Sequence, residues 1–213
     1  MKNLNLTLYL VTDSTGLTEE KFLGTVEDAC RGGVTCVQLR EKERCALEYL
    51  NLAVKVKQII DKYNIPLIID DRVDIAIAAD AAGVHVGQSD MPVSAARKLM
   101  GSSKIVGATA KTVEQAKKAA AEGADYLGVG AIFPTTTKVV TIITKVETLN
   151  EIAGAVQIPI VAIGGLNSSN IDVLYNSEAD GIAVVSAIMK NQDPCCAAEI
   201  LKRQVTENFK KLQ

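Results

Sequence analysis

The sequence predicts an α/β protein, a single (β/α)8 TIM barrel with its active site at the C-terminal ends of the strands. Short apolar segments alternate with helix-like segments over all 213 residues, and eight apolar segments occur. Small residues mark the change from helix to strand, as in CRGGVTCVQL, ADAAGVHVG, AEGADYLGVG and NSEADGIAVV, which is typical of short αβ loops. Eight such units in a chain of this length would form a compact barrel.

The strands are expected where apolar and β-branched residues run together. In chain order these segments are LTLYLVT (6–12), CVQLRE (36–41), PLIID (66–70), GVHVG (83–87), KIVGAT (104–109), YLGVG (126–130), PIVAI (159–163) and GIAVVS (181–186). Apolar residues recur at helical spacing in the gaps, most clearly over 46–63, 112–122, 145–156 and 196–211. Because helices follow the strands, we expect parallel strands joined by right-handed crossovers.

The chain shows no linker, no low-complexity tract and no break in composition, so residues 1–213 are expected to form one domain. An open, doubly wound sheet is the alternative architecture. Its first strand should lead into a glycine-rich phosphate loop, but the sequence there is VTDSTGLTEE, without GxGxxG. The barrel is therefore favoured.

Composition narrows the possible partners. The formal net charge is −2, tryptophan is absent and no basic run occurs, which argues against nucleic acid. No apolar stretch reaches the length of a membrane span, and the N-terminus lacks a signal-peptide pattern, so we expect a cytoplasmic protein. The five cysteines form no CxxC pair and are expected to be reduced thiols, and Cys195–Cys196 receives no assigned role.

Polar residues gather at the predicted C-terminal ends of the strands, where barrel enzymes build their sites. They are Gln38, Arg40 and Lys42 after strand 2, Asp70, Asp71 and Arg72 after strand 3, Gly87–Asp90 after strand 4, Thr109 at strand 5, Pro134–Lys138 after strand 6, Gly164–Gly165 after strand 7 and Val185–Ser186 after strand 8. The cations suit a polyanion, the carboxylates of Asp71 and Asp90 suit Mg²⁺, and the backbone amides after strands 7 and 8 suit a monophosphate. The pattern predicts two phosphorylated small-molecule substrates, with the metal on one of them.

Each of these features has a simpler explanation. Asp71 and Arg72 would pair with each other, Asp90 would cap the following helix, and the two glycines would only form a turn. His85, the sole histidine, is expected to be a hydrogen-bonded core residue rather than a catalytic one. The joint occurrence of polar groups at so many strand ends favours a site.

The segments QLREK, DDR after LII, GVHVGQSDMP, GATAKT, PTTTK, AIGGL and VVSAI together resemble the thiamine-phosphate synthase family over essentially the whole chain. The resemblance implies a transferase of thiamine biosynthesis that couples hydroxymethylpyrimidine diphosphate to thiazole phosphate. It implies a dissociative path in which Mg²⁺-pyrophosphate leaves first and the thiazole nitrogen traps the pyrimidine-methyl cation. Preorganised cations and a metal would stabilise the charge on the departing diphosphate.

The resemblance also implies roles for individual residues. Gln38 would read the aminopyrimidine edge, and Asp71 and Asp90 would bind Mg²⁺. The groups expected to assist the departure of the diphosphate are Arg40, Lys42, Lys138 and Thr109. The remaining positions expected to bind substrate are Leu39, Glu41, Asp70, Thr135, Thr136, Thr137, Gly165, Val185 and Ser186, of which the last three would cradle the thiazole phosphate.

The sequence departs from the family pattern in four places. Asp70 replaces the usual Asn, which adds a carboxylate beside the diphosphate. Thr109 replaces the usual Ser, and Lys111 stands where a histidine is common. Thr141 and Thr144 occur where the family has Ala and then Gly.

Two alternatives stay open. One is a thiazole tautomerase-like relative, which relies on a histidine in the strand 5 block that GATAKT lacks. The other is a non-catalytic barrel that binds phosphorylated ligands. The preference for a carboxylated or plain thiazole and the oligomeric state, with a homo-oligomer as one option, are left open.

Overall fold

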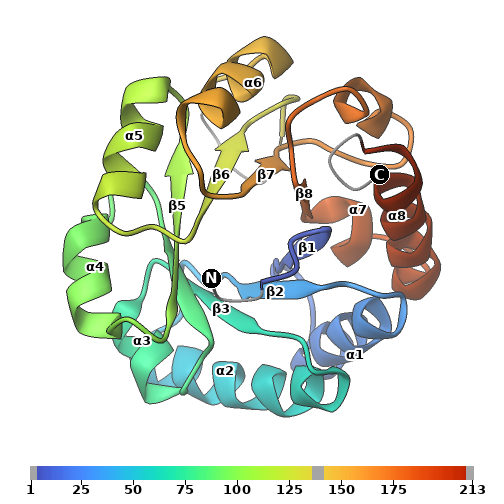
Figure 1. The fold of residues 1–213 in the computed structure, drawn as a ribbon. Helices are drawn as coiled ribbons and strands as arrows, with labels where there is room; N and C mark the ends of the chain where they lie inside the picture. The colour runs from blue at the N-terminus through green and yellow to red at the C-terminus, as the bar shows by residue number, and fades with distance from the viewer. Residues whose placement is uncertain (1–3, 136–141, 210–213) are drawn as a thin grey trace.

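A computed structural model describes residues 4–135 and 142–209, and their strands form a closed parallel barrel in the order β1 to β8. The strands are β1 Leu8–Val11, β2 Cys36–Leu39, β3 Leu67–Asp70, β4 Gly83–Val86, β5 Ile105–Ala110, β6 Tyr126–Gly130, β7 Ile160–Ile163 and β8 Gly181–Val184. Helices surround this ring (Figure 1). The predicted barrel is confirmed, and the open sheet is wrong because β1 pairs with β8.

Each strand overlaps its predicted range. The helices are α1 Glu19–Arg31, α2 Ala46–Ile60, α3 Val73–Ala78, α4 Val93–Met100, α5 Val113–Ala121, α6 Val146–Ala155, α7 Ser186–Met189 and α8 Pro194–Asn208, with two 3₁₀ turns, η1 Asp61–Tyr63 and η2 Ile171–Leu174. The helix predicted over 46–63 changes to η1 at its end, where Asn64 adopts a left-handed conformation (φ 55°). The helix predicted from residue 196 begins earlier, because Asp193 accepts a hydrogen bond from the amide of Cys196 and Pro194 occupies the first turn.

Two apolar layers follow from the alternation of side chains along the strands. A small inner cluster fills the barrel and contains Tyr9, Cys36, Ile68, Tyr126 and Val161. A larger outer cluster lies between strands and helices and includes Leu8, Val37 and Leu39. Tyr9 and Tyr126 are both buried and bring hydroxyl groups into the inner layer.

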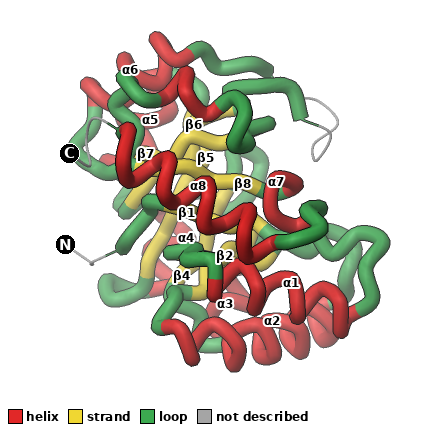
Figure 2. The backbone as a smooth tube through the Cα atoms, turned by 90° about the vertical axis from the view of Figure 1, so that its right-hand side faces the viewer, coloured by secondary structure: helices red, strands yellow, loops and turns green. Residues whose placement is uncertain are grey.

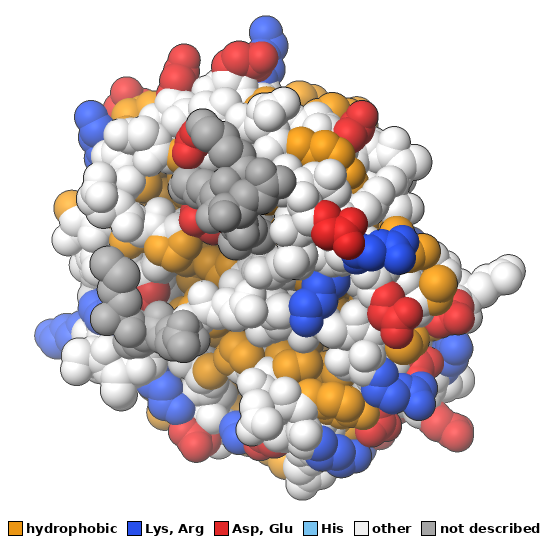
Figure 3. All heavy atoms as spheres, turned by 45° about the vertical axis from the view of Figure 1, so that its right-hand side comes forward, with side chains coloured by type: hydrophobic (Ala, Val, Ile, Leu, Met, Phe, Trp, Pro, Cys, Tyr) orange, Lys and Arg blue, Asp and Glu red, His pale blue; other side chains and the backbone are white. Residues whose placement is uncertain are grey.

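The side view in Figure 2 shows α8 running along the outside of the barrel, where it packs against α1 and β1. Helix α7 begins two residues after the C-terminal end of β8 and therefore lies at that end of the barrel. On the face seen in Figure 3, acidic and basic side chains are interspersed. Within residues 4–135 and 142–209, no helix is long and apolar enough to cross a membrane.

Candidate active site

A cavity of about 650 Å³ opens at the C-terminal ends of the strands. It is lined by eleven of the residues predicted for the site, namely Gln38, Arg40, Lys42, Asp70, Asp71, Asp90, Thr109, Thr135, Gly165, Val185 and Ser186. The predicted residues Thr136, Thr137 and Lys138 lie outside the described residues, as does Thr141. Barrel topology thus brings residues from seven different loops or strand ends to one cavity.

The chain after β2 leaves the sheet earlier than expected. The strand was predicted to reach residue 41, but its ladder ends at Leu39. The amide of Arg40 instead donates to Thr12 Oγ1 (3.1 Å), and the amide of Thr12 donates to the carbonyl of Gln38 (2.9 Å). Thr12 therefore supports the backbone that carries Arg40 and Lys42 into the cavity.

Leu39 and Glu41 point elsewhere. Leu39 is fully buried in the outer apolar layer. The Glu41 carboxylate accepts hydrogen bonds from Ser14 Oγ (2.8 Å) and Arg44 Nε (3.0 Å). Neither side chain lines the cavity, because alternate positions along this segment face opposite sides.

Opposite charges pair at the ends of β2 and β3. Lys42 Nζ lies 3.0 Å from Asp70 Oδ2 and also contacts the carboxylate of Asp71. Arg40 Nε lies 3.8 Å from the same Asp70 oxygen. Asp70 is buried, so these cations offset the cost of placing its charge away from water.

Asp71 adopts a left-handed backbone conformation (φ 61°), which aspartate tolerates better than most residues. Arg72 does not pair with it. The Arg72 guanidinium binds Asp74 instead, with Nε 2.8 Å from Oδ1, and this hydrogen bond lowers the pKa of Asp74. The simple Asp71–Arg72 pair is therefore wrong, and Asp71 faces the cavity together with Lys42.

Asp90 is held by the loop after β4. Its Oδ2 accepts a hydrogen bond from the amide of Gly87 (2.7 Å), and a side chain on Gly87 would come within 2.8 Å of that oxygen. Helix α4 begins after Pro92, so Asp90 is not its cap. In the described part of the chain no hydrogen bond engages Asp90 Oδ1, which leaves this oxygen to the cavity.

The carboxylates suit a hard cation that shares its coordination with a ligand. Among the described residues there is no group of three or more His, Cys, Asp or Glu side chains that could hold a metal ion by itself. Asp71 and Asp90 nevertheless line the same cavity. Mg²⁺ commonly binds one or two carboxylates and completes its shell with water and substrate phosphates, so the donor set fits Mg²⁺ with a bound diphosphate.

The two glycines after β7 lie where two loops meet. Gly164 (φ 106°) and Gly165 (φ 65°) both have positive φ, and the amide of Phe133 donates to the Gly164 carbonyl (3.0 Å). A Cβ on Gly165 would lie 2.6 Å from the carbonyl oxygen of Pro134. Within residues 4–135 and 142–209, no hydrogen bond uses the amides of Gly165 and Ser186, which are available to an anion.

A chain of hydrogen bonds crosses the barrel below the cavity. Gln38 Nε2 donates to Tyr9 Oη (3.0 Å), and the hydroxyls of Tyr9 and Tyr126 lie 2.8 Å apart. Tyr126 Oη lies 3.0 Å from His85 Nδ1, and His85 Nε2 lies 3.0 Å from Thr109 Oγ1. The expectation of a hydrogen-bonded, buried His85 is thus confirmed.

Sequence reasoning missed the two tyrosines. The sequence hints at them only weakly. Each tyrosine places a hydroxyl at an inward-facing strand position, and small residues on neighbouring strands leave room for the large rings inside the barrel. A Cβ on Gly107 would lie 2.1 Å from the Tyr126 ring, and one on Gly128 would lie 3.3 Å from the His85 ring. Burial lowers the pKa of His85, so the ring is neutral at physiological pH.

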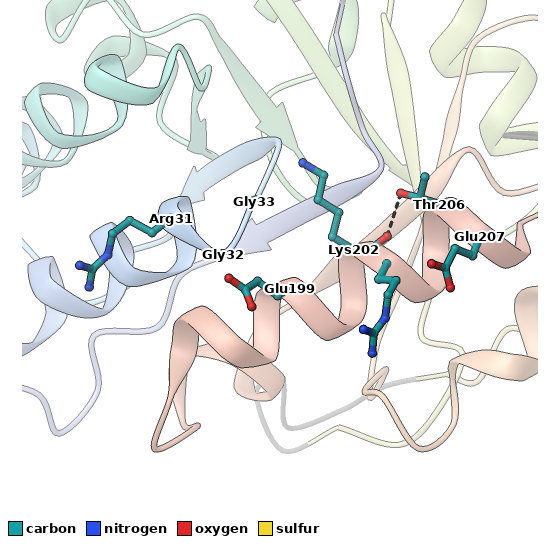
Figure 4. A pocket seen from close by; sticks show the side chains of 8 residues that line it. Arg31, Gly32, Gly33, Glu199, Lys202, Thr206 and Glu207 are labelled. Atoms are coloured by element: carbon teal, nitrogen blue, oxygen red, sulfur yellow. Dashed lines mark hydrogen bonds between the residues drawn. The ribbon is translucent and has the colours of Figure 1, made fainter.

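A second, shallower hollow lies on the outside of the barrel, between the end of α1 and helix α8 (Figure 4). Its charges are mixed, with Arg31, Glu199, Lys202 and Glu207 around it. It contains none of the predicted site residues. The cavity at the strand ends is therefore the candidate active site.

Comparisons with known proteins show which family the chain resembles. A family model described as thiamine monophosphate synthase matches residues 8–188. The chain is 52% identical over 204 residues to a thiamine-phosphate synthase of Methanobrevibacter smithii, covering 96% of this chain and 97% of the relative. It is 56% identical over 184 residues to one of Enterococcus faecalis, covering 86% and 87%.

Among solved structures, a thiamine phosphate pyrophosphorylase from Pyrococcus furiosus superposes with a TM-score of 0.88 at 37% identity, covering 96% of this chain and 97% of that one. A 3-hexulose-6-phosphate synthase at 20% identity shares the fold alone. The family model and the two relatives span most of the chain, and from them we conclude that it belongs to the thiamine monophosphate synthase family.

Proposed function

We propose that this chain is a transferase that couples hydroxymethylpyrimidine diphosphate with thiazole phosphate to give thiamine phosphate and pyrophosphate. The observation that carries the proposal is one cavity lined by cations, two metal-suited carboxylates and unengaged backbone amides. The carbon–oxygen bond to the diphosphate breaks first, and its electron pair leaves on the diphosphate. The lone pair of the thiazole nitrogen then forms the new carbon–nitrogen bond.

Arg40 and Lys42 are proposed to hold the diphosphate, with Lys138, which follows β6 in the sequence, as a third cation. Negative charge grows on the leaving group as the bond breaks, so fixed cations stabilise the transition state more than the bound substrate. Arg40 offers a planar donor fork and Lys42 a mobile point charge. Mg²⁺ on Asp71 and Asp90 would add charge stabilisation at the same oxygens.

The thiazole phosphate is proposed to bind at the opposite side of the cavity. The amides of Gly165 and Ser186, with Val185 between the strand and α7, offer donors without a competing charge. Loops after strands 7 and 8 form the phosphate site in many barrels. Thr135 lines the cavity near them and, with Thr136 and Thr137, is proposed to contact the thiazole.

The alternatives have little support. A tautomerase would need the histidine that the strand 5 block lacks, and Lys111 lines the cavity at that block. The relatives named above are synthases. We further propose a cytoplasmic location, which the five free cysteines support because reducing compartments keep thiols unpaired.

The test is product formation from the two substrates, followed as thiamine phosphate and pyrophosphate during a Mg²⁺ titration. Asp71→Asn and Asp90→Asn should each raise the Mg²⁺ concentration needed for half-maximal rate by about tenfold or more, because each removes a charged ligand. Asp74→Asn is the matched control, since that carboxylate binds Arg72 outside the cavity. Absence of turnover in the unmodified protein would overturn the proposed function, and an unchanged Mg²⁺ requirement in both variants would overturn the metal site.

A further inference from the structure

The hydrogen-bond chain below the cavity joins two residues that we assign to different parts of one substrate. Gln38 stands at one end and Thr109 at the other, and both line the cavity. Between them, Tyr9, Tyr126 and His85 are buried, with exposed fractions of 2%, 0% and 8%. No role in the reaction assigned above uses these three side chains.

The Gln38 amide sets a direction for the chain. A hydroxyl has one proton and two acceptor lone pairs, and a chain in which each tyrosine accepts from one neighbour and donates to the next uses every hydroxyl proton. The Gln38 amide nitrogen donates to Tyr9, whereas either partner can donate in the Tyr9–Tyr126 and Tyr126–His85 contacts. A chain that continues in the direction set by Gln38 has Tyr9 donating to Tyr126 and Tyr126 donating to His85 Nδ1. The neutral His85 ring then carries its proton on Nε2.

This tautomer settles what Thr109 offers to the cavity. His85 Nε2 lies 3.0 Å from Thr109 Oγ1, and with its proton on Nε2 the ring donates to that hydroxyl oxygen, which then acts as an acceptor inside the barrel. The Thr109 proton therefore turns toward the cavity, where it meets an anion as a donor. Reversing the chain would turn the proton of Thr109 onto His85 and present a lone pair to the diphosphate, which is repulsive.

The other end of the chain selects the same direction. With Nε2 bound to Tyr9, Gln38 presents Oε1 to the cavity, and within the described residues no hydrogen bond engages that oxygen. The amino group of an aminopyrimidine is a donor and needs such an acceptor. Binding of this group would hold the Gln38 amide in the orientation that makes Thr109 a donor.

We infer that Tyr9, Tyr126 and His85 are positioning residues that couple recognition of the pyrimidine amino group at Gln38 to stabilisation of the departing diphosphate by Thr109. The inference rests on the proposed function for the identity of the two substrate groups. The barrel interior is shaped for the chain, because Gly107 and Gly128 leave the space that Tyr126 and His85 occupy. A side chain at Gly107 would overlap the Tyr126 hydroxyl itself, at 2.4 Å.

The tautomer is measured directly by ¹⁵N NMR of the imidazole, which needs no substrate and no assignment because the sequence has one histidine. We expect a single neutral form with the proton on Nε2. Tyr126→Phe should remove the preference for the Nε2 proton, so the His85 ring should populate both neutral tautomers. Tyr49→Phe is the matched control, because its buried hydroxyl donates to the Leu39 carbonyl and lies off the chain, and it should leave the tautomer unchanged. A ring protonated on Nδ1 would overturn the inference.

Kinetics test the coupling to Thr109 through a double-mutant cycle. Tyr126→Phe should lower kcat about tenfold while changing the KM of the pyrimidine diphosphate little. The Thr109 hydroxyl would no longer be held as a donor toward the diphosphate, and that hydrogen bond matters most in the transition state, when charge grows on the leaving group. In a Thr109→Val background the same change should cost almost nothing further. His85→Gln, whose amide can replace the Nε2 donor, should retain more kcat than His85→Leu.

Equal losses from Tyr126→Phe with and without Thr109 would mean that the tyrosine acts through stability or another group, and would overturn the inference. These outcomes differ from failure of the proposed function. A protein that forms no thiamine phosphate from its two substrates removes the proposed function, whereas the tautomer and its response to Tyr126→Phe are read in the substrate-free protein.

Discussion

Asp70 places a carboxylate directly against the two cations that we assign to the diphosphate. Lys42 contacts both Asp70 and Asp71, and Arg40 lies within reach of Asp70. Because these carboxylates pair with the cations, a diphosphate must compete with them for Arg40 and Lys42. Mg²⁺ bound to Asp71 would engage one of the two carboxylates that pair with Lys42 and leave Asp70 as its only carboxylate partner of the two, so a diphosphate would face less competition for Lys42. Metal and substrate binding should therefore favour each other.

At the same scale, His85 gives the protein a defined response to acid. Burial lowers the pKa of His85 below its usual 6.5, an effect that Lys42 reinforces and that Asp70 and Asp90 oppose. Above the unfolded value the ring is neutral in both states. As the pH falls below about 6.5, the unfolded chain takes up the proton before the folded protein does, so the unfolding free energy decreases.

We expect that decrease between about pH 7 and 5 in urea titrations in magnesium-free buffer, at up to about 1.4 kcal/mol per pH unit. His85→Gln should flatten it, because no other histidine is present and most carboxylates titrate lower. A slope that His85→Gln leaves untouched would contradict the assignment.

Several residues that line the cavity were predictable, because polar chemistry and strand topology coincide at their positions. Gln38, Arg40, Asp71 and Asp90 are polar residues at the ends of apolar strands, a position that parallel topology brings to one edge. Tyr9 lay beyond such reasoning, because its role depends on which interior side chains meet across the barrel. That information lies in the three-dimensional packing rather than in spacing along the chain.

At the scale of elements, the loops after β6 and β7 close against each other through glycine. The amide of Ile132 donates to the carbonyl of Ile163, the last residue of β7 (3.0 Å), which extends the β6–β7 pairing beyond the end of β6. Gly165 continues this contact with no room for a side chain. The conformation that exposes its amide to the cavity is therefore fixed by packing between two loops.

Gly165→Ala tests this packing. The positive φ alone should cost about 1–2 kcal/mol, and overlap with the Pro134 carbonyl at 2.6 Å should add to the loss. The KM for thiazole phosphate should also rise, because the amide shifts. Gly16→Ala is the matched control, since Gly16 has a similar φ of 77° but no atom within 4 Å of the added Cβ.

Urea unfolding and steady-state kinetics of both variants show whether packing against Pro134, beyond the positive φ, makes Gly165 necessary. If Gly165→Ala loses no more stability than Gly16→Ala and keeps its thiazole phosphate KM, the glycine is only a turn residue.

The order and type of the elements were predictable from the alternation of apolar and helical segments, but their ends were not. The strand predicted to 41 stops at Leu39, and the side chain of Thr12, directly after β1, accepts the hydrogen bond of the Arg40 amide. The helix predicted to 63 changes at its last turn, where Asn64 adopts a left-handed conformation. Both endings depend on local contacts, which the spacing of apolar residues along the sequence does not predict.

In the whole molecule, the two ends of the barrel differ in what their residues do. The site gathers where the strands finish, whereas the opposite end is held by side chains that bond to backbone. Asp125 accepts from the amide of Val106 (2.8 Å) while its own amide donates to the Val106 carbonyl (2.7 Å). Asp180 makes the same pair of contacts with Ile160. These aspartates extend the strand pairing at the N-terminal edge, far from the chemistry.

Arg97, on α4, makes several hydrogen bonds at this N-terminal edge of the barrel. Its guanidinium donates to the carbonyls of Gly101 (2.8 Å), Lys104 (2.6 Å) and Gly123 (3.0 Å) and to the carboxylate of Asp125 (2.5 Å). These partners precede β5 and β6, so one side chain fixes the entry to two strands. Its planar donor fork cannot be reproduced by an ammonium group.

Arg97→Lys should therefore lower the unfolding free energy by about 1.5–3 kcal/mol, the range for hydrogen bonds to charged groups. Below the unfolding transition, kcat and both KM values should stay at their original levels, because the barrel's N-terminal end serves stability and its C-terminal end serves catalysis. Arg31→Lys, at an exposed ion pair with Asp28 within α1, should change stability by no more than about 0.5 kcal/mol. An Arg97→Lys protein as stable as the original, or one with a raised KM, would show that the two ends are not separated in this way.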